Sequence, residues 1–463
     1  MVSGQESVDG GNEQMSKIAK KSAIEDYSDV QAGVRTDGMP NWAERELSSE
    51  FIDEVQKRPG FDKPFLIITL VLLIIGLIMV LSASYASAYY LSGEPLRFFS
   101  RQLIFAVSGV ALMLIVSRVS VKTMSRWSSH LLLVSIALLV LVLIIGIRIN
   151  GARRWMGIGG EASSLTFQPS EIAKLAVILA YAQMACKFGI KRMKTFKFGV
   201  APFAAITAVI LFLLSMQPHL SAAIIIAALT AVMLFAGGTR LRWFMLVGLA
   251  AVAVAGILLF PGILNNAREG GVQGVVEQTT RTQMDFSRFG YAGRRINAWL
   301  DPEADPLGAG FQIRQSLYAV GSGGLLGQGL GQSRQKHLYL PEEHNDYIFA
   351  IVCEELGFVG AMLILMLFVL LIVRGFWLAL NANDKYSSLI VIGVTSLLAI
   401  QVFLNVAVVT NLVPATGISL PFFSYGGTAL WIQLVQMGIV LAVSREIPLY
   451  RKESEPDELE SAS

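Results

Sequence analysis

The stretch that decides the fold of this chain is FLIITLVLLIIGLIMVLSASYASA, residues 65–88, which contains no charged side chain. At 1.5 Å per residue, a helix of this length is long enough to cross the hydrocarbon core of a bilayer, which is about 30 Å thick. Composition agrees: 54% of the residues are hydrophobic, 15% are charged and the mean hydropathy is +0.58. Because soluble domains have a charged fraction of about 25%, the sequence predicts an all-α polytopic membrane protein.

Nine further apolar runs follow this one and give ten predicted transmembrane helices. They cover residues 103–116, 131–147, 167–185, 200–215, 220–236, 244–260, 347–373, 389–412 and 428–443. Lysine and arginine concentrate in the short loops on the side of the N-terminus, which predicts that both termini are cytoplasmic. Residues 261–345 then form a large extracytoplasmic segment between helices seven and eight.

Three parts are expected along the chain: a cytoplasmic, largely disordered tail at 1–60, a membrane domain at 61–446 and a cytoplasmic tail at 447–463. The first apolar run begins only after the polar tail, so no cleavable signal peptide is expected. The net charge of +3 fits inner loops that face anionic lipid and does not indicate nucleic-acid binding. Cys186 and Cys353 are expected to be packing residues.

The stretch YLPEEHND, residues 339–346, places several titratable groups immediately before the apolar run at 347–373. Asp346 is the last of them and should lie near one membrane face. Charged groups at a membrane edge are functional candidates. The large segment before it is too long for a plain loop in a compact domain, and a folded lid is expected there.

The outer loop NGARRW, residues 150–155, carries Arg153, Arg154 and Trp155 against the bias that keeps basic residues inside. Arginine forks suit bidentate phosphate contacts, and an indole suits a headgroup boundary or a sugar face. Anchoring to lipid headgroups is the alternative interpretation.

The stretch FQPSEIAK, residues 167–174, has the pattern of a helix start, with Pro169 in the first turn and Ser170 as a possible cap. Glu171 and Lys174 stand three residues apart and therefore share one helical face. Buried charges of opposite sign must pair or face a polar cavity. A structural ion pair and a pair that lines the cavity of Asp346 are both compatible with this spacing.

Three further stretches are less specific. The glycines of residues 321–331 could approach an anionic group, although tight turns explain them at least as well. His219, in the outer turn at 217–219, is more often a satisfied polar residue than a ligand. Residues 414–428 break the helical pattern at membrane depth, where irregular backbone must pack in protein or line a cavity.

These blocks together resemble the SEDS family (shape, elongation, division and sporulation) of bacterial membrane proteins. The matching pieces lie in family order at 151–155, 167–174, 305–312, 315–316, 321–331, 340–357 and 420–427. The motifs at 153–154, 329–333 and 419–427 look more like the division and sporulation members than the elongation member. One departure is visible, since the family usually carries aspartate where this chain has His219.

The resemblance implies a glycosyltransferase of the bacterial cytoplasmic membrane that polymerises lipid II, an undecaprenyl-pyrophosphate-linked disaccharide peptide, into glycan strands. It implies septal cell-wall synthesis with a class B penicillin-binding protein and other division proteins. Asp346 matches the essential aspartate. Substrate-binding roles follow for Arg153, Arg154, Trp155, Glu171, Lys174, Gln315, Lys336 and His344.

The chemistry requires a base for a sugar hydroxyl, a role that we assign to Asp346, and positive charge for the leaving pyrophosphate. No dedicated metal-ligand motif is present, so a divalent cation (Mg or Mn) would be shared with the pyrophosphate. A precursor flippase, a scaffold, and an elongation or sporulation member of the same family are the alternatives.

Overall fold

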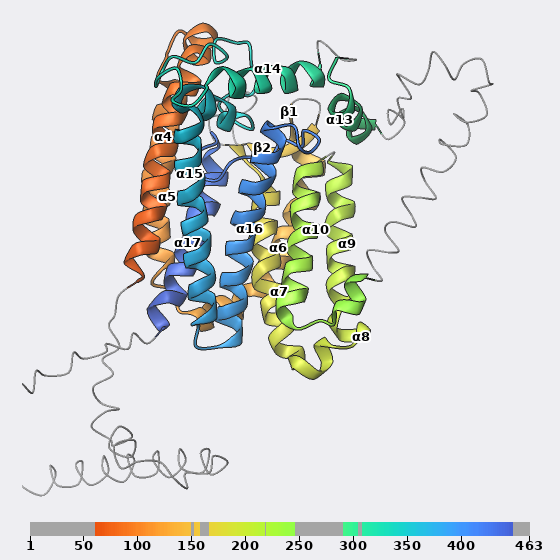
Figure 1. The fold of residues 1–463 in the computed structure, drawn as a ribbon. Coiled ribbons are helices and arrows are strands. Elements are labelled where there is room, and N and C mark those ends of the chain that lie inside the picture. Colours follow the sequence, from red (N-terminus) through yellow and green to blue (C-terminus); the bar gives the residue numbers. More distant parts are fainter. Residues whose placement is uncertain are drawn as a thin grey trace, which may run out of the picture. The chain divides into compact units, whose positions relative to one another are not determined.

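The computed structural model describes residues 61–149, 152–157, 166–217, 219–245, 290–303 and 308–447 (Figure 1). Within this part, nine helical segments are long and apolar enough to cross a membrane. They are α4 (Lys63–Ser92), α5 (Arg97–Val116), α6 (Val121–Ile145), α7 (Pro169–Met193), α8 with α9 (Phe196–Gly199 and Ala201–Met216), α10 (Leu220–Gly237), α15 (Ile348–Leu380), α16 (Lys385–Val409) and α17 (Gly427–Glu446). The chain is therefore an all-α polytopic membrane protein.

Each of these nine segments overlaps one predicted span. The remaining prediction, the seventh span at 244–260, lies almost entirely outside the described residues and stays a prediction. The predicted tails at 1–60 and 447–463 also lie outside them, apart from Ile447.

Two helices extend well beyond their apolar runs. Helix α6 begins at Val121, where Ser120 caps it by accepting a hydrogen bond from the Thr123 amide. Helix α15 continues past its apolar run to Leu380 and includes Arg374, which donates to Asp62. The apolar pattern marks only the part of a helix that meets hydrocarbon, and polar turns at the ends escape it.

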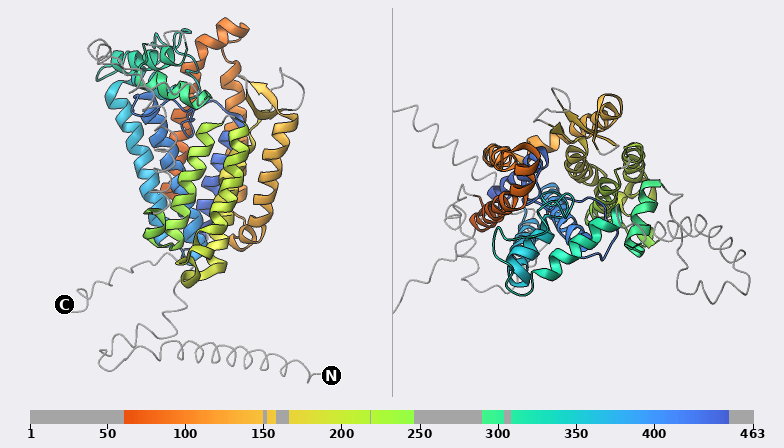
Figure 2. Two further views of the ribbon diagram at one scale, coloured as in Figure 1. Left: turned by 90° about the vertical axis from the view of Figure 1, so that its right-hand side faces the viewer. Right: turned by 90° about the horizontal axis from the view of Figure 1, so that it is seen from above.

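Helices α7, α16 and α17 lie at the centre of the bundle. Their apolar windows are 61%, 67% and 72% buried, whereas those of α5, α6 and α15 are only 28% buried. Helix α17 packs on α5, α7 packs on α6 and α10, and α16 packs on α15 (Figure 2). A helix that is apolar on all sides and largely buried belongs to the interior of a bundle, so the outer helices present their apolar faces to lipid.

Helix α15 is kinked at Gly357, where φ is 68° and ψ is −172°. A Cβ at Gly357 would lie 2.2 Å from the Gly327 nitrogen, so only glycine fits here. The amides of Gln328 and Gly329 donate to the carbonyls of Glu354 and Glu355, each at 3.0 Å. These backbone contacts confirm the turn interpretation of the glycine-rich stretch, because two of its amides bind α15 itself.

The described part of the segment before α15 is folded and contains α13 (Gly290–Leu300) and α14 (Ala309–Ser322). Figure 1 shows α14 lying across the end of the bundle at which α15 begins. Trp299 donates to the Asn411 carbonyl at 3.0 Å, and Ser316 donates to the Val409 carbonyl at 2.8 Å. The segment is thus attached to the end of α16.

The basic loop between α6 and α7 forms strands. Strand β1 (Ile147–Ile149) pairs antiparallel with β2 (Ala152–Gly157), which pairs antiparallel with β3 (Thr166–Phe167). Because β3 leads directly into α7, this small sheet links the end of α6 to the start of α7. The sequence indicated only a loop here.

Candidate active site

Asp346 lies two residues before α15 and is partly buried. Asn405 of α16 donates to the Asp346 carbonyl at 2.8 Å and to the Ile418 carbonyl at 2.7 Å. The Asp346 carboxylate packs against Gly417, where φ is 76° and a Cβ would lie 3.0 Å from Oδ2. The irregular segment after α16 therefore shapes the surroundings of Asp346, as expected for irregular backbone at this depth.

The same irregular segment binds the two residues before Asp346. Ser424 donates to the Asn345 carbonyl at 2.8 Å, and the Tyr425 amide donates to the His344 carbonyl at 2.8 Å. Three successive carbonyls before α15 are thus fixed by side chains or backbone that lie far away in sequence. This arrangement leaves the Asp346 carboxylate on a rigid support.

The pKa of Asp346 is raised to about 6, chiefly by burial and then by the negative charge of nearby Glu342. Arg295, Arg154 and His344 act in the opposite direction, and their positive charges hold the pKa below the value that burial would otherwise give. The helix start beside Asp346 lowers its pKa, whereas apolar surroundings raise it. In the structure the effect of burial is the larger one, which gives a carboxylate suited to accept a proton near neutral pH.

Arg153 and Arg154 occupy different places although they are adjacent. Arg154 is partly buried and donates through Nε to the Gln217 carbonyl at 3.2 Å. Arg153 is exposed and donates to the Leu143 carbonyl at 3.1 Å, at the end of α6. Successive residues of a strand point to opposite faces, so only Arg154 is turned toward the turn between α9 and α10. Its neighbour Trp155 is partly buried.

Glu171 and Lys174 form the predicted ion pair, with 2.7 Å between Oε2 and Nζ. Both side chains are buried, with relative exposures of 7% and 2%. The predicted cap is wrong: α7 begins at Pro169, Gln168 occupies the N-cap position, and Ser170 lies inside the first turn with its hydroxyl buried and unpartnered. Because proline is favoured at the first helical position, the N-cap lies at Gln168, two residues before the predicted Ser170.

His219 lies near both cations of this region. Its pKa is lowered to about 3, chiefly by burial and then by the positive charges of Arg154 and Lys174. His219 is therefore neutral at physiological pH, and its Nε2 contacts Gln168 at the start of α7.

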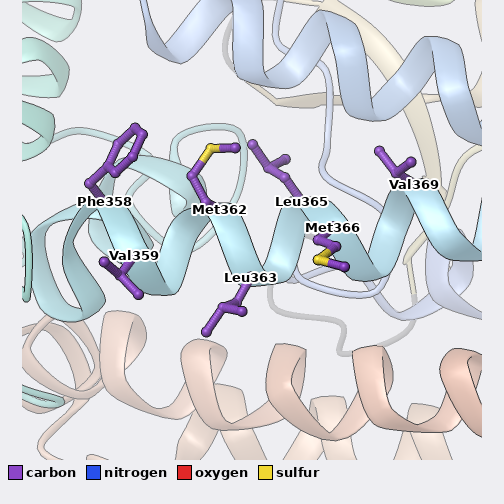
Figure 3. A pocket seen from close by; sticks show the side chains of 7 residues that line it. All are labelled: Phe358, Val359, Met362, Leu363, Leu365, Met366 and Val369. Carbon is purple, nitrogen blue, oxygen red and sulfur yellow. The ribbon is translucent and has the colours of Figure 1, made fainter.

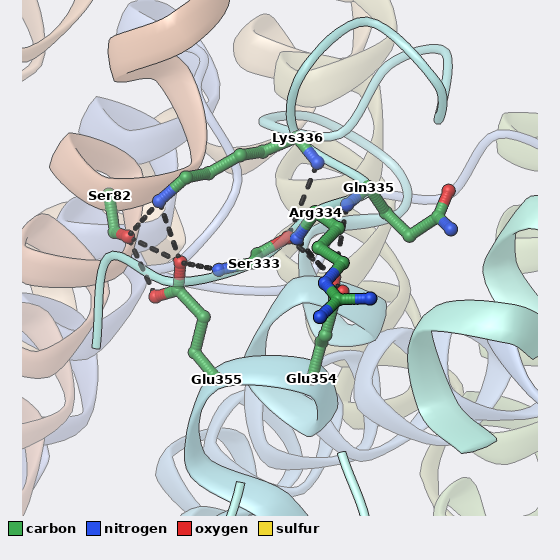
Figure 4. A network of polar contacts seen from close by, with 7 residues as sticks. All are labelled: Ser82, Ser333, Arg334, Gln335, Lys336, Glu354 and Glu355. Atoms are coloured by element: carbon green, nitrogen blue, oxygen red, sulfur yellow. Dashed lines mark hydrogen bonds and ion pairs between the residues drawn. The ribbon is translucent and has the colours of Figure 1, made fainter. Parts of the chain in front are cut away.

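The predicted residue Lys336 lies in a separate network (Figure 4). Its Nζ binds Glu355 Oε1 at 3.0 Å, and Ser82 donates to the same carboxylate at 2.7 Å. The neighbouring Glu354 accepts from the Arg334 amide at 2.9 Å. This network connects the outer segment to α4 and α15, and the substrate-binding role of Lys336 stays a prediction.

His344 and Gln315 complete the set of predicted residues. The His344 ring packs against both Phe98 and Tyr425, with centroid distances of 4.8 and 5.7 Å, and its Nδ1 is 3.2 Å from Glu343 Oε1. Gln315 is partly buried on α14. Their roles toward substrate also stay predictions.

Two residues that act on this site were not singled out from the sequence. Arg295 of α13 lies close enough to lower the pKa of Asp346, and Asn405 of α16 holds its carbonyl. The available signals were a second Arg-Arg pair at 294–295 and an asparagine inside the apolar run at 389–412.

An apolar hollow lies along α15 beyond the kink (Figure 3). It is lined by Phe358, Val359, Met362, Leu363, Leu365, Met366 and Val369. With no charged side chain, this hollow is suited to hydrocarbon and not to a pyrophosphate. Across the described ranges, no three histidine, cysteine or acidic side chains come together as a metal cluster.

The fold and the cluster of charged residues around Asp346 define a class of polytopic membrane protein. In this class a partly buried carboxylate, arginines and a lysine gather at one end of the helix bundle. The chain belongs to the FtsW/RodA/SpoVE family of cell cycle proteins, which it matches over residues 63–448.

Two relatives illustrate the match. Stage V sporulation protein E of Bacillus subtilis is 42% identical, over 84% of this chain and 98% of its own length. A probable peptidoglycan glycosyltransferase FtsW of Trichlorobacter lovleyi is 38% identical, over 86% of this chain and 97% of its own.

Two solved structures share the fold. A structure described as the structural coordination of polymerization and crosslinking by a peptidoglycan synthase complex aligns with a TM-score of 0.64 and 28% identity, over 83% of this chain and 98% of that one. The rod shape determining protein RodA of Thermus thermophilus aligns with a TM-score of 0.58 and 27% identity, over 84% and 98%.

Proposed function

We propose that this protein is a peptidoglycan glycosyltransferase that polymerises lipid II into glycan strands. The observation that carries the proposal is Asp346, whose pKa of about 6 lies near neutrality while Arg154 and Arg295 stand close by. Relatives named as probable peptidoglycan glycosyltransferases support the same activity.

In the reaction, the 4-hydroxyl oxygen of one saccharide forms a bond to the anomeric carbon of another. The bond from that carbon to the pyrophosphate oxygen breaks, and the polyprenyl pyrophosphate leaves with the electron pair. Asp346 accepts the hydroxyl proton as the new bond develops, because a sugar hydroxyl is a poor nucleophile without a base. Arg154, Lys174 and Arg295 supply positive charge for the leaving group.

A divalent cation, Mg or Mn, is part of the proposal as an ion that arrives with the pyrophosphate. Magnesium is usually held by one or two carboxylates together with substrate phosphates. Asp346 and Glu342 are the acidic groups available beside this site. A bound ion would neutralise phosphate charge, while the proton transfer and the positioning belong to the residues named above.

The proposed location is the bacterial cytoplasmic membrane, with both termini inside and Asp346 near the outer face. A class B penicillin-binding protein is the proposed partner that cross-links the strands, in a complex with other division proteins at the septum. The peptidoglycan synthase complex that shares this fold supports an assembly of this kind.

A sporulation role is a second candidate, because a stage V sporulation protein has 42% identity with this chain. The chemistry would be the same and only the timing and partners would differ. A flippase would need a polar path through the whole bundle, whereas the charged residues of the candidate site gather at one end.

Replacing Asp346 by asparagine tests the function directly. The amide keeps the shape but cannot accept the proton, so polymerisation of purified lipid II should fall by about 10²- to 10⁴-fold. Glu94→Gln, which changes an exposed acid in the loop after α4, is the matched control and should retain activity. Near-normal polymer from Asp346→Asn, in protein that folds normally, would contradict the assignment.

A further inference from the structure

His219 is a buried residue whose hydrogen bonds are incomplete. Its side chain is 8% exposed, and its Nδ1 has no partner. The other ring nitrogen, Nε2, lies 3.3 Å from Nε2 of Gln168. A buried polar atom without a partner costs free energy, so a ligand that forms a hydrogen bond with Nδ1 would be stabilising.

The contact with Gln168 fixes which nitrogen carries the proton. The amide nitrogen of glutamine can only donate, so Nε2 of His219 must accept. A neutral imidazole has one N–H group, and His219 is neutral because burial and the nearby Arg154 and Lys174 lower its pKa to about 3. Nδ1 therefore carries the hydrogen and is an unpartnered donor.

The surroundings of this donor favour an anion. Arg154 is fixed to the same turn through the Gln217 carbonyl, and Lys174 lies one and a half turns further along the helix that Gln168 begins. His219 itself precedes the N-terminus of α10, where backbone amides and the helix dipole also favour negative charge. A neutral donor and two cations thus meet at a helix start.

We infer that Nδ1 of His219 donates a hydrogen bond to a phosphate oxygen of the substrate pyrophosphate, beside Arg154 and Lys174. The inference rests on the proposed function and adds to it a residue that binds the leaving group. A carboxylate at position 219 would attract the two cations and repel the phosphate, whereas the neutral imidazole adds a hydrogen-bond donor without adding negative charge.

Two conservative variants separate this role from a packing role. In His219→Asn the amide nitrogen takes a place near Nδ1 and keeps the donor. In His219→Gln the amide lies near Nε2, so the variant can restore the contact with Gln168 but lacks a donor at Nδ1. A packing role would favour the glutamine variant, and a phosphate contact would favour the asparagine variant.

The measurement is the binding of inorganic pyrophosphate to the full-length protein in detergent, followed by calorimetry or by the shift of Tm, together with KM for lipid II. We expect His219→Gln to weaken pyrophosphate binding and raise KM by about tenfold, the effect of losing one hydrogen bond to a charged group. His219→Asn should stay within about threefold of the wild type on the same scale. His130→Gln, at an exposed histidine of α6, is the control.

Wild-type affinity for pyrophosphate in His219→Gln would overturn the inference, and so would equal losses in both variants. No binding of pyrophosphate by the wild type would overturn it as well. Binding is measured apart from turnover, so a protein that binds pyrophosphate but makes no glycan from lipid II would refute the proposed function and leave the anion contact standing.

Discussion

Asp346, the proposed general base, shows how its neighbours tune the pKa of a single carboxylate. It stands at a helix start, which favours the ionised form, yet burial outweighs this effect and raises the pKa to about 6. Glu342 raises the pKa and Arg295 lowers it, so the value is a balance between neighbours. That balance can be shifted in either direction by single substitutions.

The pH dependence of polymerisation should report this balance. A base must be deprotonated, so the rate should fall as the pH drops through about 6, the pKa of Asp346. Arg295→Gln removes a positive charge, raises the pKa and should move the acid limb to higher pH. Glu342→Gln removes a negative charge and should move it to lower pH. The measurement is kcat/KM for lipid II across pH, and shifts of the same sign in both variants would contradict the assignment.

At the scale of elements, α15 is fixed from two sides at its kink. The glycine-rich turn closes over Gly357, and the network of Lys336, Glu355 and Ser82 connects the outer segment to α4. Both features contact the first part of α15, between its start at Ile348 and the kink at Gly357. They hold the segment that carries the carboxylate.

Gly357→Ala should destabilise the protein by at least about 1–3 kcal/mol, the cost of an unfavourable backbone conformation, with a steric clash added. The φ of 68° disfavours alanine, and the new Cβ would lie 2.2 Å from the Gly327 nitrogen. Thermal unfolding in detergent measures the effect. Gly321→Ala is the matched control, because a Cβ there has nothing within 4 Å and φ is not positive; equal Tm values for the two variants would argue against the clash.

Breaking the buried ion pair between Lys336 and Glu355 should also destabilise the protein measurably. Lys336→Met leaves the Glu355 carboxylate, which is 1% exposed, without its cation, at a cost on the order of 3–5 kcal/mol. The double variant Lys336→Met with Glu355→Gln strands no charge and should recover part of the loss. Tm and the yield of folded protein provide the test. A double variant less stable than the single one would show that the pair does not act as a unit.

At the scale of the whole bundle, four segments distant in sequence meet at one end. Strand β2, the start of α7, the turn before α10 and the start of α15 bring together Arg154, Lys174, His219 and Asp346. Helices that alternate in direction return to the same end at every second connection, so loops far apart along the chain share one face. The proposed orientation places this end outside the cytoplasm.

Cysteine labelling in intact cells tests the orientation. In a background without Cys186 and Cys353, Glu94→Cys should react with a membrane-impermeant maleimide, because the loop after α4 lies at the same end as Asp346. Asn381→Cys, at the other end of α15, should react only after the membrane is opened. Both positions are exposed, so access to the membrane side decides the result, and the reverse pattern would invert the proposed topology.

The sequence by itself determined the class of fold and, within the described residues, the membrane spans. An apolar run long enough to cross a bilayer has few stable alternatives to a helix. The sequence also singled out Arg154, which runs against the topology bias, Lys174 inside a span and Asp346 at a membrane edge as candidate site residues. The spacing of Glu171 and Lys174 predicted their ion pair, because residues three apart share a helical face.

Only the tertiary structure decided what depends on long-range packing. In the structure Arg153 binds the end of α6, away from Arg154, and Lys336 pairs with Glu355. Arg295 lies near Asp346, and Nδ1 of His219 has no partner. Desolvation and distances between charges fix the pKa of Asp346, and both arise from side chains that meet only when the helices pack. Local sequence carries no record of those neighbours, so it indicates Asp346 as a candidate base and does not indicate its pKa.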